Sequence, residues 1–288
     1  MLKNSFFIFL LSLVLVVTAC GNEEKETTNE PKGDEAIEET EHEEETAQEE
    51  EKAQEEEKDE EVTEEKEDLA EVDVQPSYIV NEKTWKVEPI KDAKDKVVLL
   101  TIDDAPDKYA LEMAKTLREK NVPAIFFVNG HFLQSEEGKK TLKEIADLGF
   151  PIGNHTYHHE NLTEISEDKQ REEIISLNDL VEEIIGSRPQ FFRAPFGANT
   201  DTSLRIAKEE KMIPMNWTFG YDWEVDYQSK DALEKIMVEN PYLSNGAILL
   251  THDRSWTNEA LEGIINGIQE KGYEFLDPNK IQKEKEAA

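Results

Sequence analysis

Two adjacent carboxylates and three histidines occupy positions in this 288-residue sequence where chemistry would be possible. Asp103 and Asp104 directly follow an apolar run, and His155 and His159 are four residues apart. A third histidine, His252, follows another apolar run. Side chains at positions i and i+4 of a helix lie about 6 Å apart on one face, so the histidine pair is suited to grip one ion. Two histidines and a carboxylate with open positions suit catalytic zinc.

Each of these features also has an ordinary structural explanation. The adjacent carboxylates could simply begin a turn and cap the helix after it. The histidine pair could lie in a surface turn and bind nothing. His158 would face another direction on a helix, so we interpret it as a bystander and leave open a supporting role toward a ligand. We interpret His131 as structural.

Apolar runs alternate with amphipathic stretches along most of the chain, and this alternation predicts the fold class. Strands are expected at residues 97–102, 124–128, 151–154, 191–193, 212–217, 247–251 and 273–275, after a short β segment at 78–80 and 84–87. Helices are expected at residues 108–120, 141–148, 167–185, 203–210, 231–239 and 258–271. This alternation predicts a parallel sheet with right-handed crossovers, either a barrel or a doubly wound sheet. No glycine-rich phosphate loop follows the first strand, which makes a nucleotide-binding sheet the weaker option.

Charged and polar residues recur where these strands end. Asp103 and Asp104 end the first strand, and the histidine pair follows the third. Later strands end near Arg193, Asp222–Trp223 and His252–Asp253. A closed parallel barrel brings the carboxyl ends of its strands to one face, where barrel enzymes assemble their sites. We therefore expect these side chains to meet.

The first 19 residues have the features of a signal peptide. Lys3 precedes an apolar run at residues 6–17, which is too short for a comfortable membrane span. Val17–Cys20 resembles a bacterial lipobox, in which the cysteine is lipidated and becomes the mature N-terminus. An ordinary signal peptide or an uncleaved anchor is the alternative. Cys20 is the only cysteine, so we expect no internal disulfide and no cysteine metal ligand.

Residues 20–75 form an acidic segment that differs from the rest of the chain. Residues 21–70 contain 25 Asp or Glu and 5 Lys, and the resulting net charge of −20 is more than half of the chain's net charge of −34. Apolar residues are too sparse there to bury a core, so we predict a disordered tether. Its sign argues against nucleic acid and anionic lipid as partners. Residues 76–288 have an ordinary composition and are long enough for one globular domain.

Five short motifs in this domain resemble, in the same order, those of the polysaccharide deacetylase family, the NodB-type domains of carbohydrate esterase family 4. The resemblance extends over residues 84–275. The motifs are Thr101–Asp104, His155–His159, Arg193–Gly197, Asp222–Trp223 and Leu250–His252. The resemblance implies that residues 76–288 are a polysaccharide deacetylase domain, an α/β fold in the form of a distorted (β/α)7 barrel.

The resemblance also implies a role for each motif residue. Asp103 would be the catalytic base, oriented by Arg193, and His252 the catalytic acid, supported by Asp222. A divalent metal, zinc in our interpretation, would be bound by Asp104, His155 and His159. The remaining motif residues would contact substrate: Pro195, Phe196 with its backbone N–H at the oxyanion, and Trp223 and Leu250 around the acetyl methyl group.

The sequence departs from the family's pattern at a few positions. Ile102 and Ala105 replace the commoner Phe and Gly, and Phe196 stands where Tyr is common. Ala105 is expected to add a methyl group beside the site and to restrict the backbone. The fourth motif lacks the earlier Asp often found there. These differences concern substrate fit more than chemistry.

The expected activity is hydrolysis of N-acetyl groups from cell-wall glycan, with release of acetate. Peptidoglycan N-acetylglucosamine is the preferred substrate, and N-acetylmuramic acid is the second choice. The alternatives are a catalytically weak or inactive glycan-binding surface lipoprotein and an O-acetyl esterase. We expect a monomer on the extracellular face of the cell membrane, in contact with lipid only through its N-terminal anchor and not with nucleic acid.

Overall fold

The sheet of this protein is organised around β3 (Val97–Ala105), a strand of nine residues that is buried almost throughout. The computed structural model describes residues 76–283. The predicted signal peptide, the predicted lipidation site Cys20 and the predicted tether at residues 20–75 lie outside the described residues, as do residues 284–288. Among the described residues, no helix combines the length and apolar character needed to cross a membrane.

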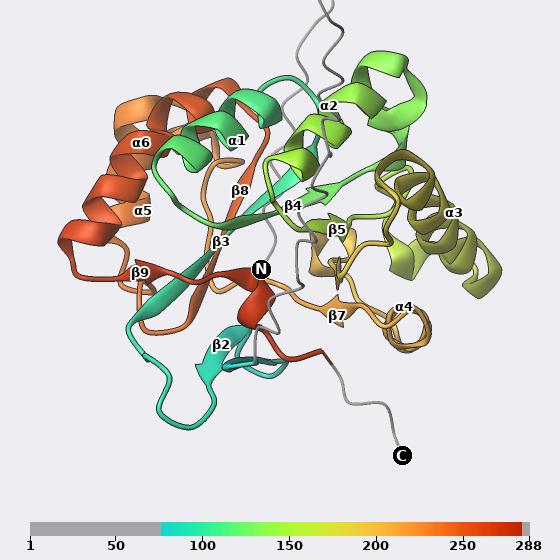
Figure 1. Ribbon diagram of the computed structural model, residues 1–288, viewed down its shortest axis with the longest axis horizontal. Helices are drawn as coiled ribbons and strands as arrows, with labels where there is room; N and C mark the ends of the chain where they lie inside the picture. Colours follow the sequence, from blue (N-terminus) through green and yellow to red (C-terminus); the bar gives the residue numbers. More distant parts are fainter. Residues whose placement is uncertain (1–75, 284–288) are drawn as a thin grey trace, which may run out of the picture. The chain divides into compact units, whose positions relative to one another are not determined.

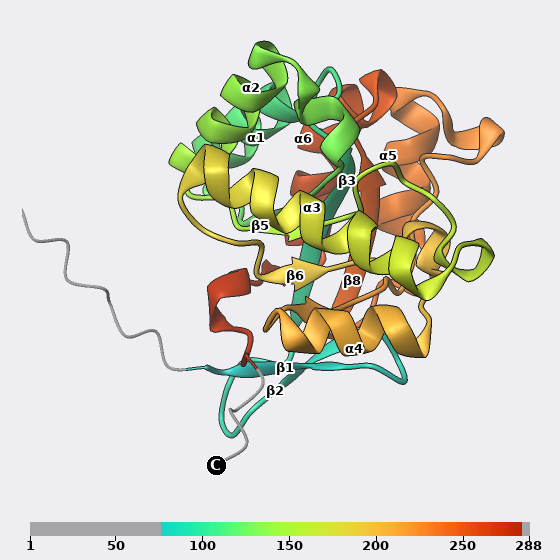
Figure 2. The same ribbon diagram turned by 90° about the vertical axis from the view of Figure 1, so that its right-hand side faces the viewer.

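Parallel strands flank β3 on both sides. The strands follow the order β1 (Tyr78–Asn81), β2 (Lys86–Pro89), β8 (Ala247–His252), β3, β4 (Ala124–Val128), β5 (Ile152–Asn154), β6 (Phe191–Phe192) and β7 (Ile213–Pro214). The short β9 (Glu274–Phe275) pairs with the first residues of β3. The hairpin β1–β2 is antiparallel and adjoins β8; it lies at the bottom of both Figure 1 and Figure 2.

The sheet nearly closes on itself after β7. Beyond Pro214 the chain leaves β6 and crosses to β8, where Phe219 forms a parallel bridge with Leu249. Thr218 N donates to Ile248 O over 2.8 Å, and Leu250 N donates to Phe219 O over 2.9 Å. This crossing is why the strand expected at 212–217 is limited to two residues. The α/β class and the distorted barrel are confirmed, and the doubly wound alternative is not.

Six helices connect these strands within residues 76–283 and cover the outside of the barrel (Figures 1 and 2). They are α1 (Ala110–Glu119), α2 (Glu136–Asp147), α3 (Glu167–Ile185), α4 (Asp201–Glu209), α5 (Lys230–Glu239) and α6 (Ser255–Glu270). Each lies where a helix was expected. The longest, α3, has the expected bounds because Ser166 accepts from Lys169 N at one end and Gly186 adopts φ 76° at the other.

Only α2 begins well before its expected start. Ser135 caps it by accepting a hydrogen bond from Gly138 N over 3.0 Å. Its first turn contains Glu136 and Glu137 but little apolar surface, so the hydrophobic pattern that indicated the helix becomes visible only further along the chain.

Alternate residues of β3 belong to two different apolar cores. Val98, Leu100 and Ile102 pack in the large core between the sheet and the helices. Val97 and Leu99 pack in the smaller core inside the barrel. This alternation is the normal consequence of a strand's two-residue period, and it directs the next odd-numbered residues toward the barrel interior.

Candidate active site

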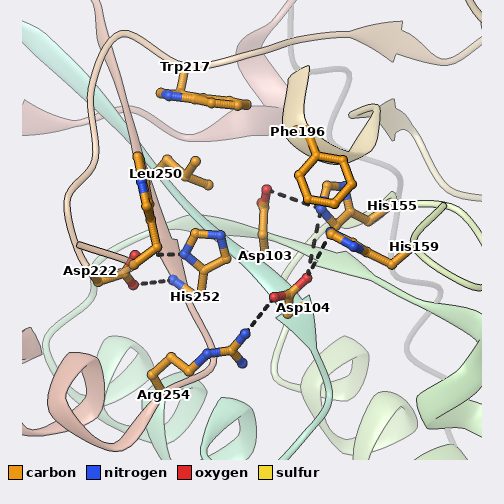
Figure 3. Close-up of a pocket in the computed structure, with 11 residues that line it drawn as sticks. Asp103, Asp104, His155, His159, Phe196, Trp217, Asp222, Leu250, His252 and Arg254 are labelled. Atoms are coloured by element: carbon orange, nitrogen blue, oxygen red, sulfur yellow. Dashed lines mark hydrogen bonds and ion pairs between the residues drawn. The ribbon is translucent and has the colours of Figure 1, made fainter. Parts of the chain in front are cut away.

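A bulge at the end of β3 brings both adjacent carboxylates to one pocket. In a regular strand, neighbouring side chains point to opposite faces. Here the register between β3 and β4 shifts between Ile102 and Ala105, and Asp104 has a φ of 58°. Asp103 and Asp104 consequently both line a pocket of about 440 Å³ (Figure 3). The pocket is lined by Asp103, Asp104, His155, His159, Phe196, Trp217, Asp222, Trp223, Leu250, His252 and Arg254.

The three expected metal ligands converge in this pocket. One ligand atom from each of Asp104, His155 and His159 lies within 4.8 Å of the others. Asp104 Oδ1 is 3.4 Å from His159 Nε2 and 3.9 Å from His155 Nε2. Two ligand atoms, each about 2.1 Å from a tetrahedral ion, lie roughly 3.4 Å apart. The spacing therefore fits a divalent metal ion.

The histidine pair lies on a loop and not on a helix, which corrects the geometry expected from its spacing. Thr156 and His159 have φ values of 66° and 61°, which are incompatible with a right-handed helix. Asn129 Nδ2 supports the loop by donating to His155 O over 2.6 Å. His155 Nδ1 lies 2.8 Å from Arg193 O, which leaves Nε2 to face the carboxylates.

His158 and His131 hold this loop in place. His158 N donates to Glu173 Oε2 over 2.7 Å, and its Nδ1 lies 2.6 Å from Glu173 Oε1. Tyr157 N donates to the backbone oxygen of the same glutamate. His158 is thus an anchor between the loop and α3, and it is not one of the three converging ligands. His131 N donates to Tyr157 O, which agrees with a structural role.

The electrostatics of the ligand set suit cation binding. Burial lowers the pKa of His159 to about 4, with a further contribution from the charge of His155, so His159 is neutral near pH 7. Burial raises the pKa of Asp104, but neighbouring His155, His252, His159 and Arg254 outweigh it and hold that pKa below its usual value. A neutral imidazole and an ionised carboxylate are the forms that bind metal.

Arg193 holds Asp103 from inside the barrel. Its side chain is fully buried, and Nη1 donates to Asp103 Oδ1 over 2.6 Å and to Thr101 Oγ1 over 2.8 Å. Nη2 donates to Asn216 O over 2.9 Å, and the guanidinium stacks on the ring of Phe127. Arg193 therefore fixes the carboxylate without lining the pocket itself, as expected for an orienting residue.

His252 lies directly across from Asp103 on the neighbouring strand. The two residues are register partners in the parallel pair β3–β8. His252 Nδ1 is 2.6 Å from Asp222 Oδ1, and His252 N donates to Asp222 Oδ2 over 2.6 Å. Burial lowers the pKa of His252, but the charge and hydrogen bond of Asp222 outweigh it and raise that pKa above its ordinary value. The ring is therefore suited to donate a proton near neutral pH.

The substrate-contact residues expected from the sequence divide into two groups. Phe196, Trp223 and Leu250 line the pocket, whereas Pro195 is buried and is not among the lining residues. Phe196 has a φ of 59°, and the residue is 67% exposed. Among the described residues, no protein acceptor is found for the Phe196 N–H.

Sequence reasoning missed two lining residues and misplaced one departure from the family pattern. Trp217 and Arg254 line the pocket although neither was singled out. Trp217 was assigned to a strand, and Arg254 directly follows the last expected polar pair. The methyl group of Ala105 was expected beside the site, but Ala105 packs in the core between sheet and helices. Its φ is negative, so the backbone there does not require glycine.

This fold and constellation belong to the deacetylase class of α/β barrels, and the comparisons with known proteins agree. The polysaccharide deacetylase family matches residues 90–213. A peptidoglycan-N-acetylglucosamine deacetylase of Bacillus cereus is 32% identical over 66% of this chain and 70% of its own length. The chain belongs to the polysaccharide deacetylase family, carbohydrate esterase family 4.

Two further comparisons show how widely function varies among the relatives. A peptidoglycan-N-acetylmuramic acid deacetylase of Bacillus subtilis is 30% identical over 67% of this chain and 74% of its own length. A mutant of a Bacillus anthracis pseudoenzyme of the family, described as having restored activity, is 31% identical with a TM-score of 0.59, over 65% of this chain and 67% of that one. The fold alone thus does not separate active from inactive members, and the site residues must be considered.

Proposed function

We propose that this protein is a metal-dependent N-deacetylase that removes acetyl groups from the N-acetylglucosamine of peptidoglycan and releases acetate. The observation that carries the proposal is one pocket that combines a metal-ligand set with a base and an acid held by separate ion-pair partners. These residues are Asp103, Asp104, His155, His159 and His252. The similarity to a deacetylase of this sugar supports the choice of substrate.

The ligand set supports zinc as the metal. Two imidazole nitrogens and one carboxylate oxygen are typical of catalytic zinc, with positions left open for water and substrate. When bound, such an ion supplies Lewis-acid chemistry, because it polarises a carbonyl and lowers the pKa of water toward about 7. His155→Ala removes one of three ligands, so we expect that variant to lose stoichiometric zinc, measured by elemental analysis after dialysis. Full retention of zinc would contradict the ligand assignment.

Asp103 is the proposed base. Its Oδ1 is occupied by Arg193, while Oδ2 lies 3.6 Å from His155 Nε2 and hence beside the ligand set. A carboxylate held in this position accepts the proton of the water that attacks the acetyl carbonyl. The hydrogen bond from Arg193 Nη1 fixes the orientation of this carboxylate, so Oδ2 is directed toward the site before substrate binds.

The developing negative charge and the departing amine need two further groups. The Phe196 N–H, which has no protein acceptor within the described residues, is available to donate to the oxyanion. His252, kept protonated by Asp222, donates its proton to the amine nitrogen as the C–N bond breaks. The products are acetate and a glycan with a free amino group.

Aromatic residues shape the space around the acetyl group. Trp223 stands edge-on to His252 with ring centroids 5.6 Å apart, and Trp217 lies 6.3 Å from Trp223. With Leu250 they form an apolar wall suited to a methyl group. The exposed ring of Phe196, on the other side of the opening, is available to pack against a sugar ring (Figure 3).

We also propose where the enzyme works. Lipidation at Cys20 would anchor it on the extracellular face of the cell membrane, with residues 20–75 as the tether and the domain as a monomer. The lipobox-like Val17–Cys20 and the acidic composition support this placement. Globomycin, which blocks lipoprotein signal cleavage, should leave the chain uncleaved in cells, and normal processing in its presence would contradict the anchor.

Mass spectrometry of muropeptides tests the proposed reaction. The purified chain, supplied with Zn²⁺, is incubated with acetylated peptidoglycan, and the sugars are examined for loss of one acetyl group. Loss from N-acetylglucosamine supports the proposal. Loss from N-acetylmuramic acid would make that sugar the substrate instead, a second candidate that the similarity to the Bacillus subtilis relative supports. Loss only from O-acetyl groups would make the protein an esterase, and no loss with glycan binding retained would make it an inactive glycan-binding protein.

A further inference from the structure

Arg254 contacts the expected metal ligand Asp104 from the side opposite to the histidines (Figure 3). Its Nη2 donates to Asp104 Oδ2 over 2.7 Å. The other carboxylate oxygen, Oδ1, is the one that faces His159 Nε2 and His155 Nε2. The two oxygens of Asp104 are therefore divided between a guanidinium and the ligand set.

The guanidinium is held where it is by its own neighbours. Arg254 Nη1 donates to the backbone oxygen of Asp253 over 3.0 Å. The Asp253 carboxylate is itself fixed, because it accepts from the backbone N–H groups of Asp107, Lys108 and Tyr109 over 2.6 to 3.0 Å. Arg254 immediately precedes α6, so its backbone is also set by the start of that helix. Hydrogen bonds to the backbone therefore fix the position from which Arg254 contacts Asp104.

We propose that Arg254 restricts Asp104 to binding the metal through one oxygen and offsets the charge of this ligand. The inference rests on the proposed metal-dependent function. Arg254 is thus a positioning residue for the reaction, although it lies outside the five motifs that indicated the site.

Two physical consequences follow from this contact. A carboxylate that binds through both oxygens occupies two coordination positions, so blocking Oδ2 keeps one more position free for water and substrate. A nearby positive charge also weakens binding of a cation, since like charges repel. The ligand set carries one negative charge, and the positive charge of Arg254 offsets it. A bound metal would therefore be a stronger Lewis acid, and the affinity of the site for the metal would be lower.

The test measures metal affinity and coordination together with turnover. In Arg254→Met, loss of the charge and release of Oδ2 should tighten Zn²⁺ binding on the order of 10-fold, measured by competition with a chromophoric chelator. Turnover should fall in the same variant. Co²⁺ substituted for Zn²⁺ should show weaker visible absorption in the variant, as the coordination number rises. Arg254→Lys keeps the charge and should bind metal close to the wild-type affinity.

Arg205→Met is the matched control, because Arg205 pairs with Glu209 on the exposed surface of α4. It should change neither metal affinity nor the Co²⁺ spectrum. Circular dichroism of the metal-free proteins shows whether each variant folds.

The outcomes separate this inference from the proposed function. Unchanged or weaker Zn²⁺ binding in folded Arg254→Met would overturn the role of Arg254, and so would equal tightening in Arg254→Lys. A wild-type chain that binds no divalent metal would overturn both the role and the metal dependence. If the affinity shift appears but wild-type protein deacetylates no glycan, the proposed function fails and the effect of Arg254 on the metal stands.

Discussion

Replacing Arg193 by methionine should destabilise the protein strongly, because the substitution removes one partner of a buried ion pair. Arg193 is fully buried and Asp103 is 1% exposed, so neither charge is screened by water. In Arg193→Met the carboxylate of Asp103 stays buried without its partner, and the backbone oxygen of Asn216 loses a donor. Removing one member of a buried pair typically costs about 3–5 kcal/mol. We expect a loss of that size in the free energy of unfolding.

A second substitution separates the charge from the packing. Asp103→Leu combined with Arg193→Met removes the uncompensated charge and leaves two apolar side chains of suitable volume. Apolar replacement of a whole buried pair is often close to neutral, so the double variant should recover roughly 2 kcal/mol or more relative to Arg193→Met. It should remain inactive, because the base is gone. The double variant would then regain stability without regaining activity.

The assay is equilibrium unfolding in urea with a chelator present, since bound metal stabilises the native state by mass action. Acetate release measures activity on the same samples. Arg205→Met again provides the control, and its exposed ion pair should contribute no more than about 1 kcal/mol. A loss below about 1 kcal/mol in Arg193→Met, or a double variant less stable than Arg193→Met, would refute this reasoning.

Three further predictions concern the acid, the base and the pocket wall. Asp103→Asn and His252→Ala should each reduce turnover about 10²- to 10⁴-fold while zinc content is preserved; wild-type rates in either would contradict its role. In Asp222→Asn, the charge that raises the pKa of His252 is lost while burial still lowers it, so the acid deprotonates at lower pH. The alkaline limb of kcat/KM should therefore move to lower pH, and an unmoved limb would show that another group titrates. Gly220→Ala should lower the free energy of unfolding by about 1–3 kcal/mol and impair turnover, because a Cβ there would lie 2.4 Å from Leu250 O. Unchanged urea unfolding and unchanged rates would show that the backbone at Leu250 shifts without cost.

Much of the fold could be predicted because local signals agreed with the tertiary arrangement. The apolar run of β3 is buried on both faces, and α3 has both a serine cap and a terminal glycine. The ends of β7 could not be predicted, since they depend on the chain crossing from β6 to β8. That crossing is a matter of closure of the whole barrel and leaves no local pattern.

The candidate site could be predicted in its membership but not in its geometry. Alternation along a strand would have separated Asp103 from Asp104, and only the bulge with φ 58° at Asp104 brings them together. The spacing of His155 and His159 predicted two neighbours on one face of a helix. They instead converge on Asp104 from a loop that His158 anchors. Arg254 contacts a residue 150 positions away, a pairing that no local pattern contains.

The pairing of Asp103 with His252 in the β3–β8 ladder has a consequence for engineering. Neighbouring strands lie about 4.8 Å apart, so the distance between these two side chains is set by backbone hydrogen bonds and not by any loop. The exposed ring of Phe196 can accordingly be varied to change which glycans fit, provided that the positioning residues Arg193 and Asp222 are kept. Such a library would vary the rim of the pocket while the spacing of the proposed base and acid stays constant.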